Sequence, residues 1–378
     1  MNTPSFHNPV AISFLEPYGW EERLRSLVDE KEPVLFLYSK SAFASVDGDG
    51  TLLRWLGTQR HVTVLTGIMS NPSFTYLADV RKKLGPIPST VVAMGGGSTI
   101  DVAKILIALQ AYPSDLESGD LLSIVEEKQY VAAKDASHLI AVPTTAGTGS
   151  ELTKWATIWD MVHKRKYSVE REDLYPAQAW VDPGLTVGLP EQITRSTGLD
   201  ALSHAVEAYW SVKSNPIVRR LASQAIVQLR QFLERAIDNP KDMEAREGMC
   251  MGSVFAGLAF SQTRTTACHA LSYPLTARYD IPHGMAVALW LAPVMKLNWD
   301  AIREKQLFTS AFRCSSREEI EQWLHTLVDS SLWKEYGITQ ASLREIYSDN
   351  DFMKDRLGNN PVAIDLDAIL PLIESGSF

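Results

Sequence analysis

Short apolar runs alternate with amphipathic stretches along the first half of the chain. Runs that are nearly all apolar are typical of strands covered on both faces of a sheet. The four such runs span residues 33–38, 61–66, 90–94 and 138–142. The stretches 73–84 and 99–111 between them have a helical pattern. This alternation of strand and helix predicts parallel βαβ units.

The pattern changes after Asp182, because helical periodicity then dominates. The expected helices span residues 200–210, 218–237, 247–260, 285–299 and 318–328. Pro183 and Pro190 punctuate the junction between the two patterns. We therefore predict an α/β domain at residues 1–185 and an α-helical domain at residues 186–378.

Composition and charge limit the classes of partner. The 36 basic and 45 acidic residues give a net charge of −9, which argues against nucleic-acid and membrane-surface binding. The N-terminus lacks a basic segment followed by an apolar stretch, so we expect no signal peptide. The three cysteines form no CxxC pair, which favours a reducing compartment. We expect a cytoplasmic protein that acts on a small molecule.

A glycine-rich turn joins the expected strand 90–94 to the expected helix 99–111. Gly95, Gly96 and Gly97 allow the backbone to approach a ligand closely, and the helix N-terminus favours a phosphate group. The turn differs from the GxGxxG fingerprint because Ile100 stands at the last glycine position. An ordinary tight turn would give the same pattern. A second polar loop, Pro-Thr-Thr-Ala-Gly-Thr-Gly-Ser-Glu at 143–151, favours a ligand site at this sheet edge.

One aspartate and three histidines stand apart from the other titratable residues. Asp200 and His204 are four residues apart on one face of an expected helix. His269 and His283 follow in apolar surroundings. One carboxylate and three imidazoles form a ligand set that suits a divalent transition metal. The alternative is a hydrogen bond on the helix surface, which is the commoner meaning of an isolated D-x-x-x-H pair.

Five ordered motifs carry a resemblance to a known family. They are Gly95-Gly-Gly-Ser-x-x-Asp-x-x-Lys104, the loop 143–151, Asp182-Pro-x-Leu185, Gly198-Leu-Asp-Ala-Leu-Ser-His-Ala-x-Glu207 and Pro282-His-Gly284. Together they resemble the iron-containing (group III) alcohol dehydrogenase family over roughly residues 10–300. The resemblance implies an α/β dinucleotide-binding domain of the dehydroquinate-synthase type joined to an all-α metal domain.

The resemblance also implies the ligands of a metal and of a dinucleotide. Fe²⁺, or Zn²⁺ in its place, would be held by Asp200, His204, His269 and His283. NADH or NADPH would be held by residues Ser39, Asn71, Gly96, Gly97, Ser98, Asp101, Thr144, Thr145, Thr148 and Lys166. The metal would act as a Lewis acid on a carbonyl oxygen while hydride arrives from the nicotinamide. A homodimer or a larger homo-oligomer is also expected.

Two positions depart from the pattern of many family members. Tyr273 stands four residues after the third metal ligand, where many members have a second histidine. The proton for the alkoxide could come from Tyr273, from a ribose hydroxyl or from water, and Tyr273 could equally be a packing aromatic. The first long strand ends in Tyr38-Ser39-Lys40 without the aspartate that often selects NAD, so we expect NADPH to be used.

The substrate expectation depends on the stretch at residues 264–276, which looks most like the phosphonoacetaldehyde reductase branch. That branch reduces phosphonoacetaldehyde to 2-hydroxyethylphosphonate. A dianionic substrate needs cations, and the candidates are Arg264, Arg278 and Lys154. The alternatives are a general oxidoreductase of short unbranched alcohols and aldehydes and, from another class, a sugar-phosphate cyclase-type lyase that uses NAD without net turnover.

Overall fold

The protein consists of two compact units. The computed structural model describes residues 5–40, 47–132, 137–163, 165–347 and 354–374. One unit spans Asn8–Gly188, and the other spans Leu189–Phe378 together with the segment that ends at His7. In the second unit, the His7 backbone N–H donates to the Gln262 side chain at 3.1 Å.

The first unit contains a parallel sheet whose described strands follow the order β1-β8-β5-β4-β2-β3. The main strands are β2 (Val34–Tyr38), β3 (Val62–Leu65), β4 (Thr90–Gly95) and β5 (His138–Pro143). Neighbouring strands pair in parallel, with Tyr38 of β2 opposite Met94 of β4 and Gly95 of β4 opposite Pro143 of β5. The four strands expected from the sequence and their parallel arrangement are confirmed.

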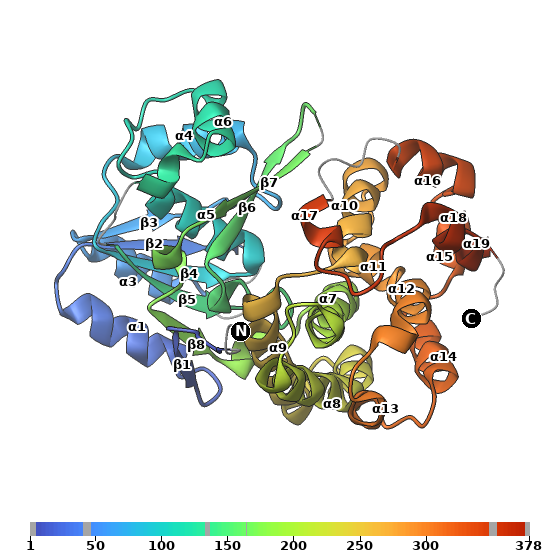
Figure 1. Ribbon diagram of the computed structural model, residues 1–378. Helices are drawn as coiled ribbons and strands as arrows, with labels where there is room; N and C mark the ends of the chain where they lie inside the picture. The colour runs from blue at the N-terminus through green and yellow to red at the C-terminus, as the bar shows by residue number, and fades with distance from the viewer. Residues whose placement is uncertain (1–4, 41–46, 133–136, 164, 348–353, 375–378) are drawn as a thin grey trace. The chain divides into compact units, whose positions relative to one another are not determined.

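Alternate residues of the central strands enter two different hydrophobic cores. Leu35 and Leu37 pack with α4 and α5 on one face, whereas Val34 and Phe36 pack with α1 and α3 on the other. The sheet is therefore covered on both faces, as Figure 1 shows for α4 and α1. This double burial explains why the strands read as unbroken apolar runs. The helices of this unit are α1 (Trp20–Asp29), α3 (Thr51–Thr58), α4 (Phe74–Leu84), α5 (Gly97–Ala108) and α6 (Ser118–Glu126).

Two further strands of the sheet and a hairpin complete the first unit. Strands β1 (Ala11–Phe14) and β8 (Gln178–Val181) extend the sheet beyond β5. Strands β6 (Trp155–Asp160) and β7 (Arg165–Glu170) form a separate antiparallel pair. The pattern of apolar residues predicts none of these four strands. They mix polar with apolar residues, and β1 and β8 have only four residues each, too few to show a clear period.

Three long helices form the centre of the second unit, and they lie against one another (Figure 1). They are α7 (Glu191–Trp210), α8 (Pro216–Asp238) and α9 (Met243–Thr263). Asn215 caps α8 by accepting from the backbone N–H groups of Ile217 and Val218, and Asp242 caps α9 in the same way through Ala245. The expected helices at 200–210, 218–237 and 247–260 all lie within these three.

The expected single helix at 285–299 is wrong, because the structure contains two helices there. These are α11 (His283–Ala288) and α12 (Leu291–Asn298). Pro293 lies in the first turn of α12, where the absence of an N–H group costs nothing. In a continuous helix the same proline would remove the hydrogen bond to Leu289 and clash with its carbonyl group. The chain therefore ends one helix and begins another ahead of Pro293.

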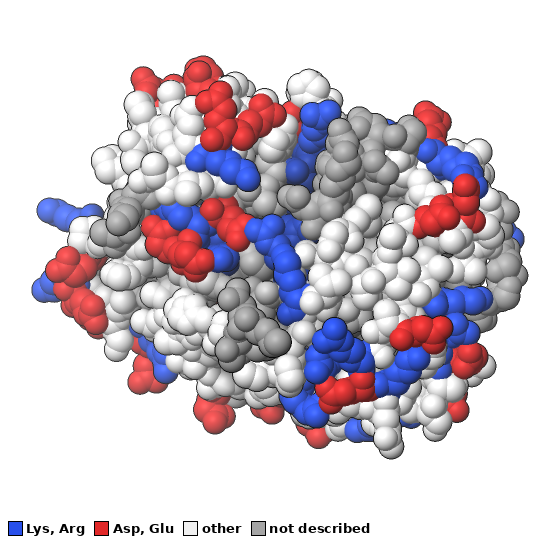
Figure 2. Space-filling view, in the orientation of Figure 1, with Lys and Arg blue, Asp and Glu red and all other residues white. Residues whose placement is uncertain are grey.

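Shorter helices complete the second unit. They are α10 (Ala267–Tyr279), α13 (Lys305–Ala311), α14 (Arg317–Leu327), α15 (Ser331–Glu335), α16 (Gln340–Tyr347), α17 (Lys354–Leu357), α18 (Leu366–Ile369) and α19 (Pro371–Glu374). None of the helices in the described part of the chain has the length and apolar character needed to cross a bilayer. On the face drawn in Figure 2, acidic and basic side chains are interspersed in small groups.

Candidate functional site

The residues expected to bind a dinucleotide begin where the parallel strands end. The Ser39 backbone N–H donates to Met94 O at 3.1 Å, directly after β2. The Thr144 backbone N–H donates to Gly95 O at 3.1 Å, directly after β5. The carboxyl ends of neighbouring parallel strands therefore bring these loops to one edge of the sheet, where ligands bind in open α/β folds.

The glycine-rich turn and the threonine-rich loop are in contact. A Cβ atom placed on Gly97 would lie 2.7 Å from Thr148 Oγ1, so only glycine allows this approach. On the other side of the turn, the Asn71 backbone N–H donates to Ser98 Oγ at 3.3 Å. Helix α5 begins at Gly97, and its N-cap residue, Gly96, has no side chain that could cap the N-terminus. Uncapped N–H groups at the start of this helix suit a pyrophosphate group.

Asp101 lies in the first turns of α5, and its carboxylate binds within the protein. Oδ1 accepts from Ser150 Oγ at 2.6 Å, and Oδ2 accepts from the Thr157 backbone N–H at 2.9 Å. Burial raises the pKa of Asp101, and Lys104 opposes this shift. The contact between Asp101 and the cofactor that the resemblance implies stays a prediction. Asp101 joins α5 to the loop and to β6.

Lys104 was part of a recognised motif but had no assigned role, and it proves to organise the same loop. Its side chain is fully buried. The ammonium group donates to the backbone oxygens of Ser150, Thr153 and Trp155 at 2.6, 2.7 and 3.0 Å. Burial lowers the pKa of Lys104 to about 8. Burial also raises the pKa of the neighbouring Glu151 carboxyl to about 7.

The remaining expected cofactor residues lie close to this framework. Lys166 belongs to β7 opposite Trp159, and its ammonium group lies 5.9 Å from the centre of that indole ring. The Trp159 backbone N–H donates to Pro72 O at 2.9 Å, which joins the hairpin to the loop that contains Asn71. Thr145 lies beside Gly96, because a Cβ placed there would be 3.5 Å from Thr145 Oγ1.

The expected metal ligands come together inside the helical unit. Asp200 and His204 lie on α7, His269 lies on α10 and His283 is the first residue of α11. Asp200 Oδ1 lies 3.3 Å from His269 Nε2 and 3.9 Å from the Nε2 atoms of both His204 and His283. One potential ligand atom from each of Asp200, His269 and His283 falls within 4.8 Å of the others. His204 approaches the same oxygen but lies outside that closest group.

The chemistry of this cluster suits a divalent metal. Asp200 Oδ1 and His269 Nε2 are buried atoms without a hydrogen-bond partner among the described residues. A buried polar atom without a partner destabilises the folded protein unless a metal ion or another polar group binds to it. Burial alone would raise the pKa of Asp200, but the charges of His204, His269 and His283 outweigh it and lower that pKa. Burial opposes a charge on His269, yet Glu207 and Asp200 raise the pKa of His269 to about 9.

Packing holds the imidazole rings in place. The His204 ring is stacked between Phe260 and His269, with ring centroids 4.0 and 4.5 Å away. Gly284 brings α11 close to α7, since a Cβ atom there would lie 1.8 Å from Ser196 O. Tyr273 is 9% exposed, and its ring is stacked against His283 with centroids 6.0 Å apart. Tyr273 therefore lies beside the cluster, as its expected role in proton delivery requires.

The three expected substrate cations lie in different environments. Lys154 forms ion pairs with Glu170 at 3.6 Å and with Glu172, so its charge is already compensated. Arg278 is exposed near the end of α10. Arg264 follows α9 directly and has φ 61° and ψ −178°, a backbone conformation that is almost exclusive to glycine.

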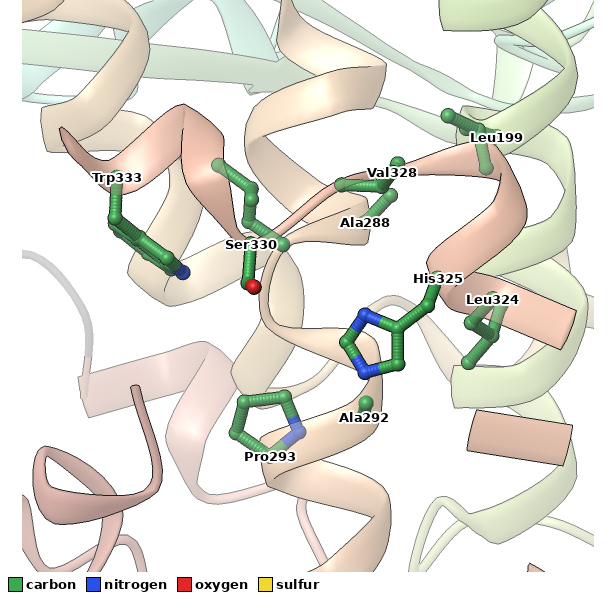
Figure 3. Close-up of a pocket in the computed structure, with 10 residues that line it drawn as sticks. Leu199, Ala288, Ala292, Pro293, Leu324, His325, Val328, Ser330 and Trp333 are labelled. Carbon is green, nitrogen blue, oxygen red and sulfur yellow. The ribbon is translucent and has the colours of Figure 1, made fainter. Parts of the chain in front are cut away.

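A small cavity lies elsewhere in the helical unit (Figure 3). Its volume is about 20 Å³, and His325, Ser330, Pro293 and Trp333 are among its lining residues. A single water molecule needs roughly 10–15 Å³ measured in this way. The cavity therefore has room for about one water molecule and not for an aldehyde or a dinucleotide.

Comparison with known proteins matches both units to one family. Residues 20–183 match the family described as "Iron-containing alcohol dehydrogenase", and residues 194–376 match "Fe-containing alcohol dehydrogenase family, C-terminal". "Alcohol dehydrogenase 4" of Saccharomyces cerevisiae (strain YJM789) is 37% identical over 297 residues, which cover 78% of this chain and 76% of that protein. "Probable alcohol dehydrogenase EutG" of Escherichia coli (strain K12) is 39% identical over 215 residues.

The match to EutG covers 57% of this chain and 53% of that protein, so the chain spans about half the length of this relative. Among solved structures, sulfoacetaldehyde reductase from Bifidobacterium kashiwanohense in complex with NAD⁺ is similar, with a TM-score of 0.78 and 29% identity. That likeness covers 98% of this chain and 97% of the other. With both units matched, the chain belongs to the iron-containing alcohol dehydrogenase family.

Proposed function

We propose that this protein reduces a short aldehyde to the primary alcohol in a metal-dependent reaction that oxidises NADPH. The observation that carries the proposal is the buried cluster in which one oxygen of Asp200 faces the Nε2 atoms of His204, His269 and His283. Two of its atoms lack hydrogen-bond partners among the described residues, which suits a metal site. Membership of the family supports the same conclusion.

The helical unit would bind the metal, and the α/β unit would bind the dinucleotide. When bound, the metal supplies a Lewis acid for the carbonyl oxygen and the reduced nicotinamide supplies the hydride. Asp200 and the three histidines would hold the metal. The turn at Gly97 and the loop around Thr148 would hold the pyrophosphate through backbone N–H groups.

Tyr273 is the candidate proton donor because its ring lies against His283. A phenol can donate the proton that completes the alcohol, and a ribose hydroxyl or water would be the alternative donor. Tyr273→Phe keeps the stacked ring and removes only the hydroxyl group. We expect turnover to fall by roughly 100-fold if the phenol is the donor. Unchanged turnover and an unchanged pH profile would assign the role to a ribose hydroxyl or water.

We infer that the substrate carries an anionic group and is phosphonoacetaldehyde. Arg264 supports this, because its backbone conformation costs about 1–3 kcal/mol and such strain is often retained at functional positions. Arg264 also lies five residues before His269 in the sequence. The likeness to a sulfoacetaldehyde reductase supports a two-carbon aldehyde with an anionic head group.

The choice of NADPH rests on the end of β2. Ser39 lies at the carboxyl end of that strand, and Lys40, which follows it, is exposed. A carboxylate at this position would repel a 2′-phosphate, whereas a hydroxyl and an ammonium group accept one. Equal rates with NADH and NADPH, or faster turnover with NADH, would contradict this preference.

The first experiment reconstitutes the purified protein with Fe²⁺ or Zn²⁺ under anaerobic conditions. Oxidation of NADPH and NADH is then followed with phosphonoacetaldehyde, sulfoacetaldehyde and acetaldehyde, which share a two-carbon chain. Metal-dependent turnover that is fastest with phosphonoacetaldehyde supports the full proposal. If turnover is fastest with sulfoacetaldehyde, that aldehyde becomes the assigned substrate. If turnover is fastest with acetaldehyde, a general reductase is favoured. Absence of net NAD(P)H oxidation with every pairing would favour the cyclase-type lyase.

A series at Arg264 tests the substrate class. Arg264→Ala removes the cation and keeps the backbone strain, whereas Arg264→Gly removes both. We expect both variants to lose activity on the anionic aldehydes and to retain activity on acetaldehyde. Arg264→Gly should also be more stable to heat than Arg264→Ala, because glycine adopts this conformation without strain. Unchanged selectivity in both variants would exclude Arg264 as the anion-binding residue.

A further inference from the structure

Glu207 lies on α7, three residues after the metal ligand His204, and it is completely buried. The surrounding stretch of α7 from Ala205 to Trp210 is otherwise uncharged. A buried carboxylate is costly unless hydrogen bonds or opposite charges compensate it. The contacts of Glu207 therefore indicate what the residue does.

Both oxygens of Glu207 are used at the start of α10. Oε1 accepts from Thr266 Oγ1 at 2.7 Å, from the Cys268 backbone N–H at 2.7 Å and from the His269 backbone N–H at 3.4 Å. Oε2 accepts from His269 Nδ1 in a close contact. Thr266 is the N-cap residue of α10, yet its own side chain does not cap the helix. A carboxylate from α7 satisfies those N–H groups instead, next to the favourable end of the helix dipole.

This contact determines which nitrogen of His269 carries the proton. Because a carboxylate only accepts hydrogen bonds, Nδ1 must carry the proton that it donates to Glu207. In the neutral ring Nε2 then keeps its lone pair, and Nε2 is the atom that faces Asp200 Oδ1 at 3.3 Å. A neutral imidazole with a lone pair on Nε2 is the form that binds a metal.

We propose that Glu207 is a positioning residue for the metal centre, holding His269 in the tautomer and orientation that place its Nε2 lone pair among the ligands. The proposal rests on the metal site of the proposed function. Glu207 does not join the ligand set, since the hydrogen bonds of its carboxylate within the described part of the chain go to Thr266, Cys268 and His269. Its effect on the metal is transmitted only through His269.

Glu207→Gln is the sharpest test because the amide has one acceptor in place of two. Three donors converge on the Oε1 position, so the amide oxygen must stay there and the NH₂ group must face Nδ1. The NH₂ group can only donate, which leaves the lone pair on Nδ1 and moves the ring proton to Nε2, where it blocks the metal. We expect metal affinity to fall by about 10- to 100-fold, the usual effect of losing such a partner.

The measurement is a titration of the metal-free protein with Zn²⁺ and Co²⁺ against a competing chelator, together with the melting temperature of each metal-free variant. Thr266→Val is the matched control, because it removes another donor to Glu207 and a partner of Trp210 without touching His269. It should lower the melting temperature and leave metal affinity near that of the unaltered protein. Glu207→Asp keeps the charge on a shorter side chain, so its affinity should lie between the other two.

Nitrogen NMR of histidine-labelled, metal-free protein above about pH 9, where the His269 ring is neutral, reads the tautomer directly. His269, assigned by comparison with His269→Gln, should carry its proton on Nδ1 in the unaltered protein and on Nε2 in Glu207→Gln. Equal metal affinity in Glu207→Gln and the unaltered protein would overturn the role of Glu207 and leave the metal site intact. Failure of the unaltered protein to bind either metal would instead overturn the proposed function itself. If Glu207→Gln does not fold, Glu207→Asp and the NMR signal of the unaltered protein decide the question.

Discussion

The loops of the α/β unit and the metal cluster of the helical unit are built in opposite ways. The loops use backbone groups and glycines that follow consecutive strands, and their charged residues, Asp101 and Lys104, bind the protein itself. The metal cluster uses side chains from three helices, and Glu207 supports it from within α7. The first site therefore depends on how closely backbones approach, and the second depends on the orientation and charge of buried side chains.

The largest effect should come from removing a proposed metal ligand. Asp200→Asn takes away the carboxylate that faces all three imidazoles, so we expect turnover to fall on the order of 1,000-fold or more, because a Lewis acid contributes several kcal/mol. NADPH binding, measured by fluorescence, should be unchanged because the loops lie in the other unit. Asp280→Asn, at an exposed position, is the control. Loss of NADPH binding in Asp200→Asn would show that the loops of the α/β unit depend on the cluster in the helical unit.

The next largest effect is expected at Gly284. In Gly284→Ala the new Cβ would lie 1.8 Å from a backbone oxygen of α7, so α11 must move and carry His283 with it. Overpacking of this kind costs about 1–3 kcal/mol of stability. We expect metal affinity to fall by about tenfold or more, since ligands must be held within about 0.5 Å. Gly57→Ala is the control, because nothing lies within 4 Å of the new Cβ, and it should leave metal affinity unchanged. If Gly284→Ala bound metal as tightly as Gly57→Ala, the close approach of α11 to α7 would not matter for the metal site.

A smaller and complementary effect is expected at Gly97. In Gly97→Ala the new Cβ would lie 2.7 Å from Thr148 Oγ1, and a side chain can move away more easily than a backbone oxygen. The KM for NADPH should rise by about tenfold, because the turn and the loop are pushed apart. Metal affinity should remain that of the unaltered protein. A drop in metal affinity in Gly97→Ala would show that the glycine-rich turn also affects the metal site. An unchanged KM for NADPH would show that the close approach of Gly97 and Thr148 is not needed for cofactor binding.

The last effect concerns pH and the buried Glu151 carboxyl, and it is a change in stability and not in binding or turnover. Burial raises the pKa of Glu151 to about 7, so the folded protein holds this proton more tightly than the unfolded chain does. The stability from this group is therefore complete below about pH 4.5 and is lost as pH rises through about 7. Glu151→Gln imitates the protonated form and should match the unaltered protein at pH 4.

Above pH 7, Glu151→Gln should be the more stable protein, by on the order of 3 kcal/mol. Melting temperatures between pH 4 and pH 8 test this difference. A constant difference across that range would show that Glu151 does not titrate in the folded protein. Activity is not needed for the measurement, so the result concerns the loop framework alone.

Parts of the fold could be predicted because their signals are local. The central strands are buried on both faces and therefore appear as unbroken apolar runs. The hairpin of β6 and β7 could not be predicted, since Arg165, Lys166 and Ser168 interrupt its apolar pattern. The helix at 285–299 was predicted as one element because an apolar run hides a break, and only Pro293 signalled it.

The sequence by itself determined the chemistry available to this protein: three glycines after a buried strand, and one aspartate with three histidines in a recognisable order. Tertiary structure alone decided what each group does. Asp101 binds Ser150 and Thr157, and Glu207 orients His269 across 62 residues of chain, contacts that no local spacing encodes. Ligand types are a property of residues, whereas partners depend on which helices pack together, and only the folded chain brings those helices into contact.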